Sequence, residues 1–108
     1  MVDFIYCRGG DKHAPELTRT ANMKYGIRYD YTAYAPVYML DVGLNRKWTS
    51  YKRKVKKHRP KFALVPDFEA HRDAIQIALY IQDLRDLSVP LIGVAPKFEG
   101  ALSQIELA

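Results

Sequence analysis

The chain has 108 residues and a formal net charge of +5, with 48% hydrophobic and 27% charged residues, which are values typical of one globular domain over residues 1–108. No apolar stretch approaches the roughly 20 residues that a membrane helix needs, so we expect no membrane partner. The N-terminus has no basic leader followed by an apolar run, and we therefore expect a cytoplasmic protein without a signal peptide.

A strand and a helix open the predicted fold. The apolar run over residues 3–7 stops at two glycines, which is typical of a buried strand that ends in a turn. Pro15 then stands early in a helix-compatible segment, where its missing N–H costs nothing. In that helix we expect Leu17 and Ala21 to face inward.

The rest of the chain alternates strand and helix, with one exception. Apolar runs predict four more strands, and apolar positions spaced by three and four predict two more helices. The strands cover 25–29, 37–40, 62–66 and 91–95, and the helices cover 48–59 and 70–87. Residues 30–36 are too few for a helical crossover. This pattern indicates an α/β fold of parallel βα units with about five strands.

Acidic residues follow these strands at the edge where parallel α/β folds bind ligands. Asp30 follows the second strand, Asp41 the third and Asp67 the fourth, with Glu69 two residues further on. Because neighbouring strand ends lie about 5 Å apart, Asp41 and Asp67 can converge on one small polar ligand. They can bond the donor edge of a purine-like base, and one can serve catalysis as a general acid or base. Each aspartate can instead cap a helix or turn.

The positive charge is concentrated in one segment. Nine of the 17 lysines and arginines lie between Arg46 and Lys61, without an acidic residue among them, so the remaining eight face twelve acidic residues, a net of −4. Such a stripe can neutralise nucleic-acid phosphates and give salt-dependent affinity. It can equally be the solvated outer face of a helix. The candidate phosphate-binding residues are Lys52, Arg53, Lys54, Lys56, Lys57, Arg59 and Lys61.

Metal and cofactor sites are not expected. Cys7 is the only cysteine, so neither a disulfide nor a cysteine-based zinc site can form within one chain, and its apolar surroundings predict a buried thiol. The three histidines, at positions 13, 58 and 71, lack the spacing of a metal site. Two adjacent glycines, at positions 9 and 10, are too few for a phosphate-binding loop.

Five tyrosines between residues 25 and 38 form a second compositional feature. Aromatic rings can stack nucleic-acid bases. Core packing and the anchoring of loops explain tyrosines in such a segment equally well, and we favour this interpretation for most of them.

Four motifs in combination resemble the phage-type DNA 7-deazaguanine transglycosylases, relatives of the tRNA-guanine transglycosylases. The resemblance covers residues 3 to about 102. The motifs are Met23-Lys24-Tyr25-Gly26-Ile27-Arg28-Tyr29-Asp30, Tyr38-Met39-Leu40-Asp41, Leu64-Val65-Pro66-Asp67-Phe68-Glu69 and Ala95-Pro96-Lys97-Phe98-Glu99-Gly100.

The resemblance implies the first half of a TIM barrel and an enzyme that exchanges guanine in a nucleic acid, DNA rather than tRNA, for a 7-deazaguanine base. In that superfamily, aspartates after successive early strands contact the exchanged base. By position, these roles fall on Asp41 and Asp67. The family's nucleophile is an aspartate that attacks the sugar carbon, and it lies on a later part of the barrel.

Five strands are fewer than the eight of a barrel, and the nucleophile has no counterpart up to Ala108. We therefore expect catalysis to need residues from another chain, and a homo-oligomer or a second chain to cover the open half-barrel. The alternative hypothesis is a truncated, catalytically inactive viral-type copy that binds nucleic acid or a host protein. A third is a sugar- or nucleotide-binding module without nucleic acid.

Overall fold

The computed structural model describes residues 5–6, 12–43, 47–67, 69–70 and 73–95. Four features discussed above lie wholly or largely outside these ranges: the thiol of Cys7, the two glycines at positions 9 and 10, His71, and the motif over 95–100, of which only Ala95 is described.

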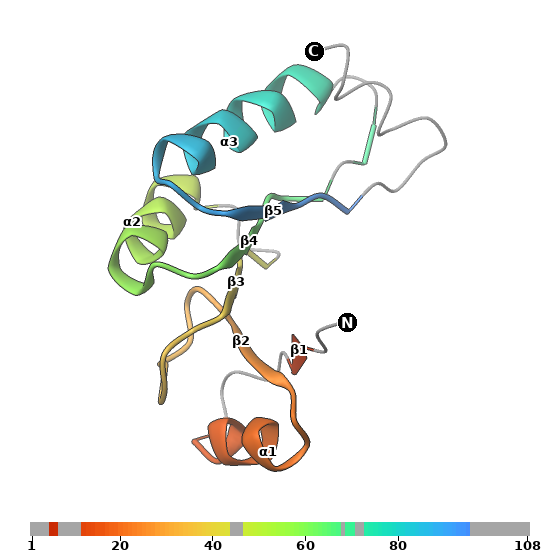
Figure 1. The fold of residues 1–108 in the computed structure, drawn as a ribbon. Coiled ribbons are helices and arrows are strands. Elements are labelled where there is room, and N and C mark those ends of the chain that lie inside the picture. The colour runs from red at the N-terminus through yellow and green to blue at the C-terminus, as the bar shows by residue number, and fades with distance from the viewer. Residues whose placement is uncertain (1–4, 7–11, 44–46, 68, 71–72, 96–108) are drawn as a thin grey trace.

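The described chain contains five strands and three helices that alternate except at one place (Figure 1). Residues 29–38 join the second strand to the third without a helix, as their number predicts. All the predicted elements are present, with ends shifted by a few residues. They are β1 (Ile5–Tyr6), α1 (Ala14–Thr20), β2 (Lys24–Arg28), β3 (Met39–Asp41), α2 (Trp48–His58), β4 (Phe62–Leu64), α3 (Ala74–Asp86) and β5 (Leu91–Gly93).

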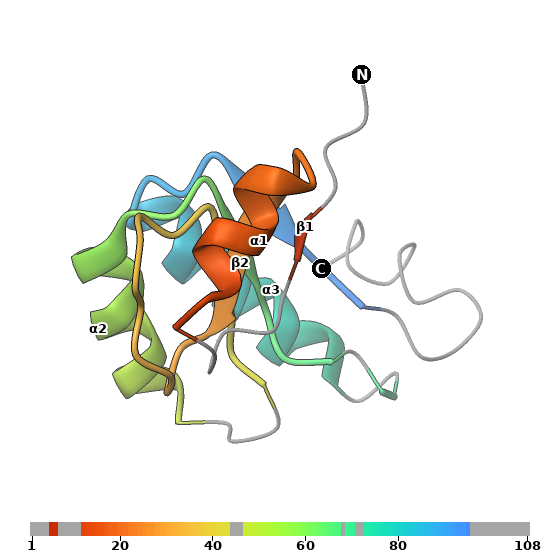
Figure 2. The same cartoon turned by 90° about the horizontal axis from the view of Figure 1, so that it is seen from below.

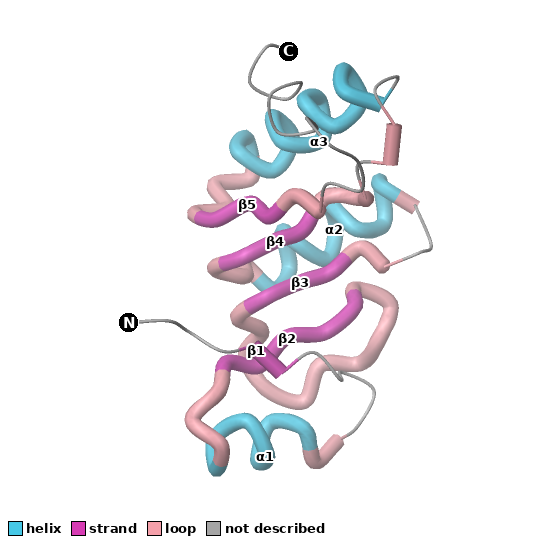
Figure 3. The backbone as a smooth tube through the Cα atoms, turned by 90° about the vertical axis from the view of Figure 1, so that its right-hand side faces the viewer, coloured by secondary structure: helices cyan, strands magenta, loops and turns pink. Residues whose placement is uncertain are grey.

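The five strands form one parallel sheet whose spatial order is the chain order, β1-β2-β3-β4-β5. Figure 3 shows them in a row from β1 to β5. Doubly wound sheets reverse this order at some point, whereas the repeated βα units of a barrel do not. The predicted α/β fold of parallel βα units is therefore confirmed, and all its strands end at the same edge.

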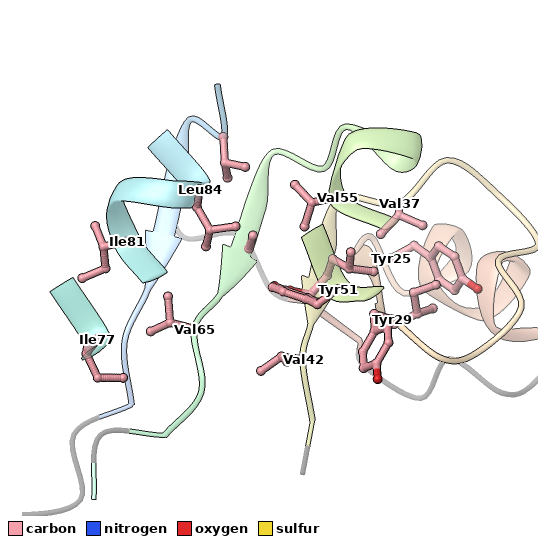
Figure 4. Close-up of a cluster of buried hydrophobic side chains, with 14 of the residues drawn as sticks. Tyr25, Tyr29, Val37, Val42, Tyr51, Val55, Val65, Ile77, Ile81 and Leu84 are labelled. Carbon is pink, nitrogen blue, oxygen red and sulfur yellow. The ribbon is translucent and has the colours of Figure 1, made fainter. Parts of the chain in front are cut away.

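One face of the sheet is covered by helices. In Figures 1 and 2, α2 and α3 lie together on one side of β3, β4 and β5. Alternate strand residues point to this side, and Ile27, Leu40 and Ala63 are fully buried there. Each of three neighbouring strands thus contributes a fully buried residue to this face, which forms the hydrophobic core (Figure 4).

The opposite face of the sheet carries a second set of apolar side chains. A Cβ atom on Gly93 would lie 2.4 Å from Leu64 Cδ2 and 2.6 Å from Phe62 Cε1, so these three residues share this face. Phe62 and Leu64 are half-buried, and Leu91 at the start of β5 is 51% exposed. Parallel sheets are normally covered on both faces, but no helix or strand of the described residues covers this one.

Tyr51 of α2 links the core to two strands. Its side chain is fully buried, and its hydroxyl lies 2.8 Å from the carbonyl oxygen of Leu40 and 2.6 Å from that of Leu64. A hydroxyl has one proton, so it donates to the two carbonyls in a shared or alternating bond. Its ring meets the ring of Tyr29 edge to face at 5.7 Å. One side chain thereby fixes α2 against the ends of β3 and β4.

A second link holds α2 against α3. The Trp48 indole N–H donates a 2.8 Å hydrogen bond to Asp83, and the Trp48 ring packs 4.1 Å from the ring of Tyr80. Lys52 adds an ion pair with Asp83 at 3.5 Å. The orientation of the basic helix is therefore set by aromatic and polar contacts to both of its neighbours.

The prediction for helix α1 is wrong in its rotation. Leu17 is 51% exposed and Ala21 is exposed as well, whereas Ala14 and Thr18 are buried. The buried pair has the i, i+4 spacing of one helix face and consists of small side chains, which let the seven-residue helix approach β1 and β2 closely. The Thr18 hydroxyl is satisfied by a 2.7 Å bond to the carbonyl of Pro15.

The link through Tyr51 predicts a stability difference between two matched substitutions. Tyr51→Phe removes the hydroxyl from two buried carbonyls and should lower the free energy of unfolding by about 1–3 kcal/mol. Tyr80→Phe removes a hydroxyl that bonds to no described residue, and it should change the free energy of unfolding by less than about 0.5 kcal/mol. Urea unfolding of both variants measures the difference, and equal losses would contradict the role given to the Tyr51 hydroxyl.

Candidate functional site

The end of β2 carries a paired charge. Arg28 donates two hydrogen bonds to Asp30, from Nε to Oδ1 at 2.5 Å and from Nη2 to Oδ2 at 3.0 Å. The side chains of both residues are about one third exposed. The guanidinium also lies 4.3 Å from the ring of Tyr31, within the range of cation–π contacts. The charge of Asp30 is thereby balanced within its own turn.

Asp41 stands beside this pair as the last residue of β3. Arg28 and Asp41 are register partners in the parallel ladder, and the Tyr29 N–H donates to the Asp41 carbonyl at 2.8 Å. The Asp41 carboxylate accepts the Gly43 N–H at 3.0 Å, which closes an Asx turn. Its second oxygen accepts no hydrogen bond from a described residue. Asp41 therefore closes a turn, which is the structural alternative given for it above.

Gly43 is required where the chain turns away from β3. Its φ of +66° lies in the left-handed region, and a Cβ atom there would lie 2.3 Å from Cδ of Arg28. The arginine side chain therefore runs across the glycine. Because of this close approach, Arg28, Asp30 and Asp41 form a single polar group, which we call the strand-end cluster.

The charges in the cluster affect two pKa values. The hydrogen bond to Asp30 is the largest cause that raises the pKa of Arg28, and the charge of Asp41 adds to it in spite of some burial. Burial raises the pKa of the Tyr51 hydroxyl strongly, and the negative charge of Asp41 raises it further. Tyr51 is therefore a neutral hydrogen-bond donor close to Asp41 and is unsuited to act as a base.

Asp67 lies at the same edge as Asp41 but on the helix side. It follows β4 by three residues and lines a cavity of about 60 Å³ with Pro66 and residues of α3. This space suits water and is far below the volume of ligand pockets. Glu69, two residues on, is exposed.

The structure thus joins two of the four acidic candidates, Asp30 and Asp41, through Arg28. Arg28 lies within the first of the four motifs, but its residue type alone predicted no role for it. The signal was an arginine two residues before an aspartate at the end of a strand, because oppositely charged side chains so close in the chain can pair in the turn that follows. The pairing with Asp41 depends on strand register, which one sequence does not reveal.

The basic stripe is divided by the structure into groups with different surroundings. Lys52 is bound to Asp83, and Arg53 is exposed. Lys54 and Lys57 line a cavity of about 320 Å³ beside residues 30–33. A larger cavity of about 570 Å³ lies at the other edge of the sheet, between the end of α2 and the connection from α3 to β5. It is lined by Lys56, Arg59 and Lys61, among others.

The tyrosines also separate into two groups. Tyr25 and Tyr29 are buried in the core, as expected for most of them, and Tyr38 is half-buried. Tyr31 and Tyr34 are 39% and 51% exposed in the connection between β2 and β3. Tyr31 and Tyr34 are therefore the most exposed rings among these five tyrosines.

Among the described residues, no helix is long and apolar enough to span a bilayer. Across the same ranges, no three histidine, cysteine or acidic side chains lie close enough to hold a metal ion.

Comparison with known proteins adds no assignment, since no protein-family model, no curated protein and no solved structure matches the chain. The transglycosylase relationship therefore stays a prediction that rests on the motifs.

The strand-end cluster predicts coupling between Gly43 and Arg28. Gly43→Ala forces a side chain into the left-handed region and against the arginine, and should destabilise the protein by about 1–2 kcal/mol. In an Arg28→Ala background the clash with the arginine side chain is gone. Gly43→Ala should then lower the free energy of unfolding by a smaller amount. Urea unfolding of the four proteins of this double-mutant cycle measures the coupling. Equal costs in both backgrounds would show that the arginine does not lie across the glycine in solution.

Proposed function

We propose that this chain binds a nucleic acid and holds one guanine-type base at the carboxyl edge of its sheet, as half of a transglycosylase-like barrel. The observation that carries the proposal is the position of Asp41, which ends β3 in a singly wound parallel sheet beside Arg28 and Asp30. Active sites of barrel enzymes occupy this edge.

The chemistry of the strand-end cluster suits a guanine. The base presents two adjacent N–H donors on one edge, which a carboxylate such as that of Asp41 can accept. It presents O6 and N7 as acceptors on another, and arginine is the side chain that most often bonds them. Arg28 supplies such a guanidinium, now directed at Asp30. Asp67 and Glu69 would approach the same base from the loop after β4.

A second chain forms part of this proposal. The face of the sheet opposite the helices carries Phe62, Leu64 and Leu91, and large exposed apolar surfaces mark sites of association. The reaction of the family also needs a nucleophilic carboxylate from a later strand of the barrel. We assign both the cover and the nucleophile to another chain, either a second copy or a different polypeptide.

A titration with free bases tests the proposal. Guanine and 7-deazaguanine should bind the native chain in calorimetry, and Asp41→Asn should weaken both by about tenfold, because asparagine keeps the turn acceptor but loses the charge that favours N–H donors. Asp67→Asn should weaken them less, since Asp67 lies further from the cluster. Asp86→Asn serves as the matched control, because this exposed aspartate lies on α3 at the opposite edge.

If the native chain binds neither base, the proposed base-binding site at Asp41 is wrong. Retained oligonucleotide binding would then favour the second function, a catalytically inactive protein that binds nucleic acid or a host protein through its basic helix.

One observation supports this alternative by itself. Six of the seven candidate phosphate ligands, all except Lys52, form no ion pair with the part of the chain that the structure describes.

A further inference from the structure

A polar cavity of about 320 Å³ lies between α2 and the connection that follows β2, and we call it the α2 groove. One wall consists of Lys54, Lys57 and His58, whose i, i+3, i+4 spacing places them on one helix face. The other wall consists of residues 30–33, which include Tyr31 and Thr32. The volume lies within the range of small-ligand sites.

The α2 groove has a positive charge that its own walls do not balance. Its one acidic residue, Asp30, is engaged by both nitrogens of Arg28. Lys54 and Lys57 have no carboxylate partner among the described residues. Two ammonium groups, an imidazole and a threonine hydroxyl then remain as hydrogen-bond donors around one space. This set of donors fits an anion with several acceptor oxygens.

Tyr31 adds an aromatic surface to this wall. Its ring packs against Arg28 and is still 39% exposed. Aromatic side chains of this kind stack on bases of any sequence, and the effect accompanies phosphate contacts in single-strand binding proteins. A phosphate in the groove would therefore have a stacking surface beside it for the attached nucleoside.

We infer that the α2 groove binds one phosphodiester group of a single-stranded nucleic acid, held by Lys54, Lys57 and His58, with the neighbouring base on Tyr31. The inference deepens the proposed function and rests on its nucleic-acid part, but not on the base pocket at Asp41. It also separates Lys54 and Lys57 from Lys56, Arg59 and Lys61, which line a different cavity.

His58 provides a reporter inside the groove. Burial is the first cause that lowers its pKa from 6.5, and the charges of Lys57 and Lys54 lower it further. The opposite wall contributes Asp30, already paired with Arg28, and the hydroxyl of Tyr31. A bound phosphate would oppose the two lysines and raise the pKa of His58. Binding would then take up a proton. The affinity for the phosphate should therefore rise as the pH falls through the region in which His58 titrates.

The experiment is an NMR pH titration of the histidine Cε1–H signals, with and without a thymidine hexamer. This oligonucleotide has no guanine and no group that titrates between pH 5 and 8. The pKa of His58 should rise by about one unit at saturation, as it does for a histidine that gains a nearby opposite charge. The signals of the other two histidines, at positions 13 and 71, report any general effect of the ligand.

Charge-removing variants give the second readout. Lys54→Gln and Lys57→Gln should each weaken hexamer binding by about three- to tenfold at moderate salt. Lys56→Gln removes the same charge one or two positions away and should weaken it by less than about twofold. A bound hexamer that leaves the His58 pKa unchanged would overturn the inference, and so would equal losses in all three variants.

Two further arms separate the sources of failure. Sulfate at matched ionic strength should raise the His58 pKa only at concentrations at least about tenfold higher than the hexamer, since it offers one anion and no base. A sulfate effect without a hexamer effect would assign the groove to small free anions and overturn the nucleic-acid part. The thymidine hexamer has no guanine, so a failed titration with free guanine would leave the His58 result intact.

Discussion

The hydroxyl of Tyr51 is the contact on which the arrangement of this protein depends most. It reaches the carbonyl oxygens of Leu40 in β3 and Leu64 in β4 from the middle of the basic helix, and the tyrosine itself is fully buried. Such a buried donor is costly to leave unsatisfied, so it fixes both the rotation of α2 and the alignment of the two strand ends. The acidic edge and the basic helix are therefore positioned by the same side chain.

The two ends of α2 differ in how their positive charges are balanced. Trp48 and Lys52 are held by Asp83 of α3, so the start of the helix is neutralised within the fold. Its C-terminal half has no such partner among the described residues and borders the α2 groove, where Asp30 is already bound to Arg28. The distribution of carboxylates, more than the number of lysines, determines where positive charge is left for a ligand.

Much of the fold was predictable because each element has a local signal. Ile77, Ile81 and Leu84 carry a helical period, and Asp41 follows an apolar strand, so the elements and the acidic edge could be expected. The prediction of the buried side of helix α1 was wrong because seven residues contain too few turns to define an apolar face. Two small residues, Ala14 and Thr18, are buried instead. The Arg28–Asp41 proximity depends on strand register, and the groove at Lys54 depends on how a helix packs beside a distant loop.

We propose that one nucleic acid is bound both at the strand-end cluster and along α2. Binding of a thymidine hexamer and of a hexamer that carries one guanine, over a series of salt concentrations, separates the two contributions. Guanine should raise the affinity by about tenfold, as one bidentate contact would. Asp41→Asn should abolish this gain, and the salt dependence should stay the same for both ligands. Equal affinities of the native chain for the two hexamers would contradict base recognition at Asp41 and leave only a phosphate-binding protein.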